Sequence, residues 1–275
     1  GYGVKFILSD SQTEITRYPN QTGRLDTYRE GMKYGEIWGY TTVGIAKTQE
    51  EMDAHLASLP NGGQDAIGSR WEAGDLMFAD INGDGKIDNG ANTIDDHGDL
   101  KIIGNSTPRF QFGLDISADY KGFDFRAFFQ GVMKRKYFQN SWFFWGSGSG
   151  VYGSSCQIPH LDYFRNDENH PLGLNMNSYF PRPDFSDEKN HQVQTGYLQN
   201  AAYIRLKNVQ LGYTLPESLT RKFAVSRLRL FVSGENLWTG ASLFDNFDPE
   251  TIDGGSQGNV YPLSKVISCG LSVNF

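Results

Sequence analysis

The strongest constraint on the fold is a strict alternation of side-chain types at the end of the chain. From residue 267 to residue 275, odd positions are apolar and even positions are small or polar: Ile267, Cys269, Leu271, Val273 and Phe275 against Ser268, Gly270, Ser272 and Asn274. A period of two puts the two sets on opposite faces of one β-strand. Such a strand suits a soluble β-sandwich, and it also suits a membrane β-barrel with lipid on one side and water on the other.

Four further segments alternate in the same way, with Phe128 and Phe231 as exceptions. They span residues 109–120, 123–133, 201–215 and 226–238. Each is long enough for the roughly 9–11 residues that a membrane-crossing strand needs. Lys121 and Gly122 separate the first two segments, which predicts a hairpin with a two-residue turn.

The connections between these segments are of two kinds. The turns at 121–122 and 215–224 are short, whereas residues 31–107, 136–199 and 240–262 form long connections rich in Gly, Asn, Asp, Ser and Trp. Short turns that alternate with long loops are typical of outer-membrane barrels, and loops of this length usually have a function. One helix is predicted, over Thr48–Leu59, with acidic residues early and Pro60 after its end.

Composition excludes two classes of protein. The net charge of -7 and the pI near 5.2 exclude a nucleic-acid binder, which would present a basic face. The mean hydropathy is -0.49, and no apolar run approaches the roughly 18 residues of a membrane helix, which excludes a helical membrane protein. A membrane β-barrel is compatible with this mean hydropathy, because the strands of a barrel are only half apolar.

Several segments, taken in order, resemble the C-terminal part of the SusC/RagA family of TonB-dependent outer-membrane transporters of Bacteroidetes. They are EGMKYGEIWGYTTVGI, GDLMFADINGDGKID, IGNSTPRFQFGLDISADYKGFDFRAFFQG, AAYIRLKNVQLGYTLP, LRLFVSGENLWTG, FDPE and YPLSKVISCGLSVNF. The terminal aromatic Phe275 also resembles the end signal of bacterial outer-membrane barrels. The match runs from about Glu30 to Phe275.

The resemblance implies an all-β fold in which residues 1–275 are C-terminal strands of an antiparallel transmembrane β-barrel. Such a barrel has roughly 22 strands, and the three long connections become extracellular loops. The implied function is import of oligosaccharides or peptides across the bacterial outer membrane, not catalysis. The implied partners are the rest of the barrel and its plug, a SusD-like surface lipoprotein, TonB through an N-terminal region, and outer-membrane lipid.

The start of the chain carries a physical expectation of its own. The first ten residues, GYGVKFILSD, have the pattern of a β-strand from the first position on. We therefore expect Gly1 to be an internal residue of a longer polypeptide. A piece of barrel has two open edges, and each unpaired backbone group in hydrocarbon costs several kcal/mol. We therefore expect further polypeptide to pair with the N-terminal strand and with the strand that ends at Phe275.

The segment DINGDGKID matches a calcium-binding loop at most positions. Oxygen ligands fall at alternate positions and Gly85 allows the sharp turn; the ligand set is Asp80, Asn82, Asp84, Asp88 and the backbone carbonyl of Lys86. Position 12 is Ala91 where a glutamate is expected, and Asp95, Asp96 or Asp99 could replace it. The alternative is a turn held by bonds from Asx side chains to the backbone.

Aromatic residues gather in the long connections and predict a contact with substrate or with a partner. The candidates are Trp38, Tyr40, Trp71, Trp142 and Trp145. Aromatic faces stack on sugar rings and cover extended ligands. The alternatives are an aromatic girdle at the membrane interface and packing against another protein.

Two other functions remain as alternatives. One is a soluble or surface-attached, calcium-stabilised β-sandwich that binds glycans, and the other is a glycoside hydrolase. Hydrolysis needs two carboxylates facing each other across a cleft, which sequence neighbours such as Asp95 and Asp96 do not indicate. The exposure of the apolar strand face distinguishes a sandwich from a barrel, because a sandwich would bury apolar side chains that a barrel exposes to lipid. These side chains are Phe110, Phe112, Leu114, Ile116, Phe125, Phe129, Leu271, Val273 and Phe275.

Overall fold

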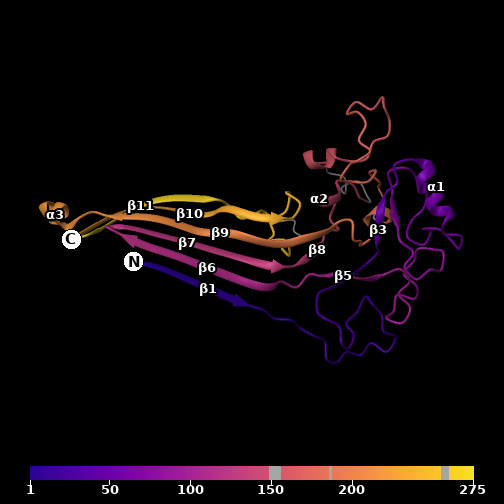
Figure 1. Cartoon of the computed structure of the whole chain (residues 1–275), viewed down its shortest axis with the longest axis horizontal. Coiled ribbons are helices and arrows are strands. Elements are labelled where there is room, and N and C mark those ends of the chain that lie inside the picture. The colour runs from indigo at the N-terminus through magenta and orange to yellow at the C-terminus, as the bar shows by residue number, and fades with distance from the viewer. Residues whose placement is uncertain (149–155, 186–187, 255–259) are drawn as a thin grey trace.

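The computed structural model consists of one long antiparallel sheet with a lobe of folded connections at one end (Figure 1). It describes residues 1–148, 156–185, 188–254 and 260–275. Both chain termini lie at the opposite end of the sheet, which we call the turn end (Figure 1). In these described ranges, no helix has the length and apolar character needed to cross a membrane.

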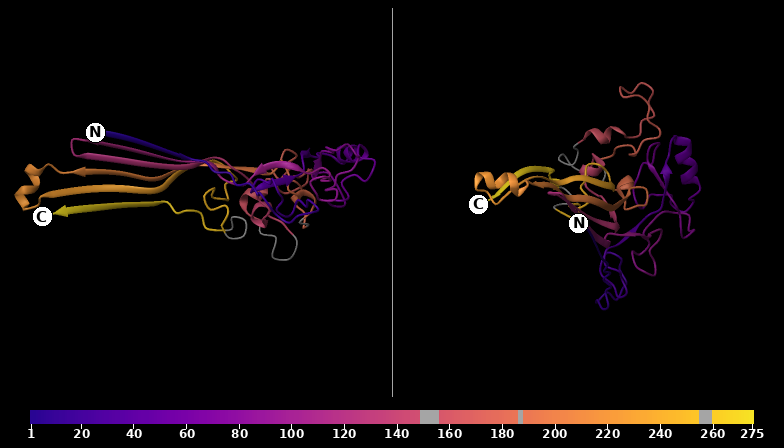
Figure 2. Two further views of the ribbon diagram at one scale, coloured as in Figure 1. Left: turned by 90° about the horizontal axis from the view of Figure 1, so that it is seen from below. Right: turned by 60° about the vertical axis from the view of Figure 1, so that its left-hand side comes forward.

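Six long strands and one short strand form the main sheet, in the order β1–β6–β7–β9–β10–β11, with β8 paired to β9. Each strand runs antiparallel to the strands beside it, and β1 and β11 form the outer edges of the sheet (Figure 2). The strands are β1 (Tyr2–Ser9), β6 (Arg109–Tyr120), β7 (Phe123–Lys134), β8 (Lys136–Phe138), β9 (Leu198–Thr214), β10 (Arg227–Ser242) and β11 (Val266–Asn274). The predicted antiparallel strands are thus confirmed.

The hairpin between β6 and β7 has the predicted two-residue turn. Tyr120 pairs with Phe123, and the intervening Lys121 and Gly122 have φ of +46° and +88°. Positive φ at both positions is the type I′ geometry, whose twist matches that of the flanking strands. At the same end of the sheet, β9 and β10 are joined through α3 (Glu217–Thr220) and a 3₁₀ turn, Arg221–Phe223.

The long connections fold together into what we call the loop lobe. It contains two small sheets, one of β2 (Glu36–Gly39) and β5 (Lys101–Asn105) and one of β3 (Thr42–Ile45) and β4 (Leu76–Phe78). Its helices are α1 (Gln49–Ala57), α2 (Trp142–Trp145) and the 3₁₀ turns Ile158–Leu161 and Lys189–His191. Most of the buried hydrophobic cluster lies here, including Met52, Phe78, Ile87 and Phe144.

Helix α1 confirms the helix predicted over Thr48–Leu59. It spans Gln49–Ala57, and the side chain of Thr48 accepts a hydrogen bond from the backbone N–H of Glu51 at 3.2 Å. A hydroxyl at this position satisfies one of the donors that the first turn leaves unpaired. Met52 points into the lobe and is fully buried, which fixes the helix against the rest of the lobe.

Candidate functional site

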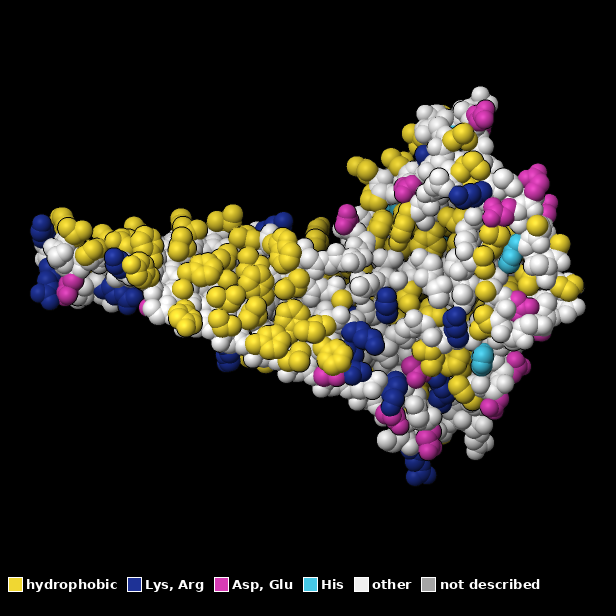
Figure 3. Space-filling model, in the orientation of Figure 1, with side chains coloured by type: hydrophobic (Ala, Val, Ile, Leu, Met, Phe, Trp, Pro, Cys, Tyr) yellow, Lys and Arg dark blue, Asp and Glu magenta, His cyan; other side chains and the backbone are white. Residues whose placement is uncertain are grey.

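One face of the long sheet is apolar along most of its length. The register places alternate residues of neighbouring strands side by side, for example Phe123, Tyr213, Leu230 and Leu271. Figure 3 shows this face as a broad apolar area, with Lys and Arg side chains at the turn end. We call it the apolar face; its members are Tyr2, Val4, Phe6, Leu8, Phe112, Leu114, Ile116, Tyr120, Phe123, Phe125, Phe129, Val209, Leu211, Tyr213, Leu228, Leu230, Val232, Trp238, Ile267, Cys269, Leu271, Val273 and Phe275.

The apolar face is not covered by another layer of protein. None of the nine residues that discriminate a barrel from a sandwich is buried, and Phe275 is 92% exposed. Among the residues that the structure describes, the only other sheets are the two-stranded ones of the loop lobe. A β-sandwich would bury this face between two sheets, so the sandwich alternative does not fit the fold.

The opposite face, which we call the polar face, has ion pairs between strands. Arg126 donates to Asp115 at 3.1 Å through Nε and at 2.5 Å through Nη2. Arg229 of β10 donates to Asp124 of β7 at 2.9 Å and 2.5 Å, although β9 lies between these strands. The pair passes over Gly212, where a Cβ would lie 2.4 Å from Asp124 Oδ2 and 2.5 Å from Arg229 Nη2. A glycine here gives the two side chains room to meet.

Two of the long connections are joined by a buried ionic cluster. Asp75 is fully buried and accepts from Lys189 Nζ and from Asn190 Nδ2, each at 2.9 Å. Lys189 also donates to the backbone carbonyl of Arg70 at 3.0 Å. The partners lie more than a hundred residues apart in sequence. Because buried charges are tolerated only when they are paired and hydrogen-bonded, this cluster fixes how the connections pack.

The connection between β10 and β11 is attached to the polar face by a second group of charges, the Arg205 cluster. Arg205, only 3% exposed, donates to Asp248 and to Glu250 at 2.7 Å each and to Thr239 Oγ1 at 2.8 Å. Lys207 of the same strand donates to Glu250 at 3.0 Å. These contacts hold the described part of the connection over β9 at the lobe end of the sheet.

The electrostatics of Asp248 follow from this arrangement. Burial acts to raise the pKa of the carboxyl, but hydrogen bonds from Arg205 and from the backbone N–H groups of Glu250 and Leu263 outweigh it, so the pKa is lowered. Asp248 is therefore ionised at neutral pH and is a full partner of the buried guanidinium.

The predicted calcium loop is closed by hydrogen bonds from side chains to the backbone. Asp80 accepts from the N–H of Gly83 at 2.6 Å and of Gly85 at 2.8 Å. Asp99, fully buried, accepts from the N–H of Ile81 at 2.8 Å and of Asp88 at 3.0 Å, and Asp96 accepts from the N–H of Ala91 at 3.1 Å, so two of the three acidic candidates reach back to the loop. Burial raises the pKa of Asp99. In the described ranges, no group of three or more His, Cys, Asp or Glu side chains is arranged to hold a metal.

Calcium binding at this loop stays a prediction, because the oxygen ligands suit a hard cation while hydrogen bonds alone also close the turn. If calcium binds, a chelator should increase tryptic cleavage after Lys86, since a ligand at about 100 times its Kd stabilises the bound form by about 2.7 kcal/mol. Asp80→Asn, which keeps the size of the side chain and removes its charge, should abolish the calcium effect. Cleavage at one rate with calcium, magnesium or chelator would show that hydrogen bonds alone hold the loop.

The five predicted aromatic contacts do not form one site. Tyr40, Trp71 and Trp145 are 4–6% exposed and belong to the core of the loop lobe. Trp38 is half-buried beside Arg29, and Trp142, at the start of α2, is 38% exposed. Burial favours a packing role for the first three, and contact with a ligand stays a prediction for the accessible pair.

Sequence reasoning did not identify the Arg205 cluster or the Asp124–Arg229 pair as functional groups. The sequence did contain an indication of the Arg205 cluster, because the segment FDPE includes both Asp248 and Glu250. Their partner, Arg205, lies 43 and 45 residues earlier. Such a distance gives no periodic pattern, so only the folded chain shows the pairing.

Comparison of sequences finds relatives with a consistent description, although no family model matches the chain. Three proteins of Formosa agariphila, described as TonB-dependent receptors P3, P26 and P39, are 29%, 26% and 28% identical over 90%, 86% and 99% of this chain. The match covers only 23%, 22% and 28% of those proteins, so the chain spans about a quarter of their length. The expected resemblance to TonB-dependent receptors is confirmed.

Comparison of structures shows the same relationship at the level of the fold. A structure described as the RagAB peptide transporter matches with a TM-score of 0.66 and 21% identity, and covers all of this chain and 27% of that chain. A structure of the RagAB peptide importer in its open-open state matches with a TM-score of 0.63 and 20% identity over all of this chain and 26% of that one. The fold of the sheet and lobe together is thus one already seen in solved structures.

Proposed function

We propose that this chain, similar over most of its length to TonB-dependent receptors, is a C-terminal part of the wall of an outer-membrane β-barrel that imports nutrients. The observation that carries the proposal is the exposed apolar face opposite a charged polar face. Strands of a membrane barrel alternate in this way, with lipid outside and a polar interior. In water, an exposed apolar surface of this extent would be a liability to aggregation.

The dimensions of the apolar face support a position across a bilayer. On β10 it runs from Leu228 to Trp238, which is about 33 Å of strand. At the usual tilt of about 40°, this corresponds to a height of roughly 25 Å, the size of the apolar band of outer-membrane barrels. Aromatic side chains mark the turn end of the face, where Tyr2, Tyr120 and Phe275 are 92%, 70% and 92% exposed. Such rings favour the interface between lipid and water.

The two ends of the sheet then have distinct positions. Short turns lie on the periplasmic side of outer-membrane barrels and long loops lie outside, so the turn end faces the periplasm and the loop lobe faces the cell exterior. Further strands pair with β1 and β11 and complete a barrel of roughly 22 strands, because open edges are not tolerated in hydrocarbon. Phe275 is the barrel-end residue at the periplasmic interface.

The transport cycle would involve parts beyond these residues. We propose that a plug and a TonB-contacting segment belong to the polypeptide that carries the remaining strands, and that a SusD-like lipoprotein meets the loop lobe. The substrate class is oligosaccharides or peptides. The name of the RagAB peptide transporter supports a peptide as one of the two, and the accessible Trp38 and Trp142 are the candidate contacts.

The two cysteines allow a direct test in intact cells. Cys156 lies in the loop lobe and Cys269 on the apolar face, and both are exposed in this chain. We expect the protein in the outer-membrane fraction, with Cys156 labelled from outside by an impermeant maleimide and Cys269 labelled only after denaturation. A protein that stays in aqueous buffer without detergent, or equal labelling of both cysteines, would contradict the proposal.

A further inference from the structure

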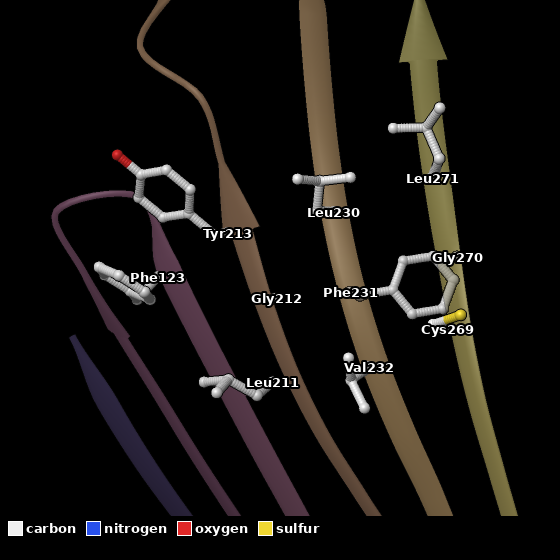
Figure 4. Close-up of a pocket in the computed structure, with 10 residues that line it drawn as sticks. All are labelled: Phe123, Leu211, Gly212, Tyr213, Leu230, Phe231, Val232, Cys269, Gly270 and Leu271. Carbon is white, nitrogen blue, oxygen red and sulfur yellow. The ribbon is translucent and has the colours of Figure 1, made fainter.

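The apolar face has a hollow close to the turn end. It measures about 540 Å³ and is lined by Phe123, Leu211, Gly212, Tyr213, Leu230, Phe231, Val232, Cys269, Gly270 and Leu271 (Figure 4). Its lining comes from β7, β9, β10 and β11, so one side of the hollow is formed by the outer strand β11. The lining is almost entirely apolar.

The hollow follows from the sizes of side chains in adjacent rows. Of the rows that line the hollow, the one nearer the turn end is Phe123, Tyr213, Leu230 and Leu271, and all four are large. In the next row, Leu211 pairs with Val232, which pairs with Cys269, so the side chains become smaller toward β11. One row further, Val232 and Cys269 are followed by Gly234 and Ile267. Large side chains on the turn-end side therefore border a floor of smaller ones on β10 and β11.

A cation, Lys121, lies two residues before Phe123 of the lining and beside the Tyr120 ring of the apolar face. Lys121 Nζ lies 5.3 Å from the centroid of the Tyr120 ring, and Tyr120 pairs with Phe123 of the lining. The next residue, Gly122, is close to the Tyr213 ring, as a Cβ there would approach that ring to 3.1 Å. Among the described residues, Lys121 has no ion pair. The nearby carboxylates Asp119 and Asp124 alternate onto the polar face.

The neighbouring turn gives a second indication of contact with a membrane surface. Leu219 and Phe223, in α3 and the 3₁₀ turn after it, are 49% and 80% exposed, and Lys222 is exposed between them in sequence. Apolar side chains beside basic ones are the composition of segments that lie in an anionic lipid interface.

We propose that the hollow binds one anionic glycerophospholipid, with an acyl chain along Val232 and Cys269 and the phosphate at Lys121. This site rests on the proposed membrane position of the sheet, and it adds a specific ligand to what would otherwise be a uniform lipid contact. The chemistry is complementary at both ends, because the acyl chain meets an apolar lining and the phosphate meets a cation that has no carboxylate partner.

The test uses Cys269 as a reporter in the full-length protein purified in detergent, with Cys156→Ser and with any cysteine outside these 275 residues also replaced by serine. Phosphatidylglycerol should slow alkylation of Cys269 by N-ethylmaleimide more than phosphatidylcholine does. Lys121→Gln should weaken the effect of phosphatidylglycerol about fivefold, the contribution of one lysine near an anionic surface. Lys134→Gln, an exposed lysine at the other end of β7, is the matched control and should change nothing.

Each outcome has a definite meaning. Equal protection by both lipids, unchanged in Lys121→Gln, would overturn the site in favour of unspecific occupancy by detergent or apolar chains. Protection that depends on protein concentration and not on lipid would point to a second copy of the chain on this face and would also overturn it. Native mass spectrometry should find phosphatidylglycerol retained by the wild type and lost from Lys121→Gln. Membrane fractionation stays as in the wild type in any of these cases, and so does Cys156 labelling of Lys121→Gln in protein that keeps this cysteine, so failure here is distinct from failure of the proposed function.

Discussion

Replacing Arg205 by alanine should release the connection between β10 and β11 from the polar face of the sheet. Arg205 is buried between Asp248 and Glu250, and its removal leaves the Asp248 side chain, 6% exposed, without its cation. Removing one partner of a buried ion pair costs about 3–5 kcal/mol. The amide of Thr251, which donates to the backbone carbonyl of Asp248 at 3.2 Å, should therefore exchange with solvent about 10²- to 5 × 10³-fold faster.

Hydrogen exchange of the full-length protein measures this effect locally. Arg126→Ala is the control, because its pair with Asp115 lies on the polar face too, but the Arg126 side chain is 64% exposed. Exposed pairs contribute roughly 0–1 kcal/mol, so exchange at Thr251 should not change in the control. If both variants had the same small effect, the Arg205 cluster would not be what holds the connection.

The same cluster predicts a direction for the pH dependence. The pKa of Asp248 is lowered in the folded chain, so its ionised form stabilises the fold above its ordinary pKa of about 4. This contribution is lost as the pH falls through the lowered value. The protection of Thr251 should therefore decrease in acid in the wild type, and this part of the pH dependence should be absent from Arg205→Ala.

Val232→Arg should destabilise the membrane-inserted protein by about 2–4 kcal/mol, the cost of arginine near the middle of a lipid-facing barrel surface. Val232 lies on the apolar face and is 54% exposed. In water, an exposed valine could be replaced by arginine at a cost within about 0.5 kcal/mol. The substitution thus distinguishes a lipid environment from an aqueous one, and unfolding by denaturant in lipid vesicles measures the difference.

Ser233→Arg is the matched control for this substitution. Ser233 is the next residue of β10, pairs with Gln210 and Ser268, and lies on the polar face. It shares the strand, the depth and the introduced charge with Val232→Arg and differs only in the face. Equal destabilisation of the two variants would argue against lipid on one side of the sheet.

The sequence was informative wherever the structure depends on local periodicity. The alternation from Ile267 to Phe275 predicted β11, and Lys121–Gly122 predicted a turn whose type I′ geometry needs positive φ at both positions. The acidic start and Pro60 predicted α1, which begins after Thr48 and ends at Ala57. Each of these features depends on a few neighbouring residues, so a single sequence contains the necessary information.

The long connections show the limit of that reasoning. The aromatic residues Tyr40, Trp71 and Trp145 read equally well as ligand contacts or as core, and their burial depends on segments that meet only in the fold. Asp75 and Lys189, 114 residues apart, are an example of such a meeting. Nothing in their local sequence indicates that they pair.

The sequence by itself determined the two faces of the strands wherever no register shift interrupts them, because an alternation of period two fixes the side on which each residue lies. It also determined the relationship to TonB-dependent receptors. Only the tertiary structure decided which charges of the polar face meet, that the long connections form one lobe, and that small side chains from β10 and β11 leave a hollow beside Lys121. The physical reason is that register and packing depend on contacts between distant segments, and a local pattern does not contain them.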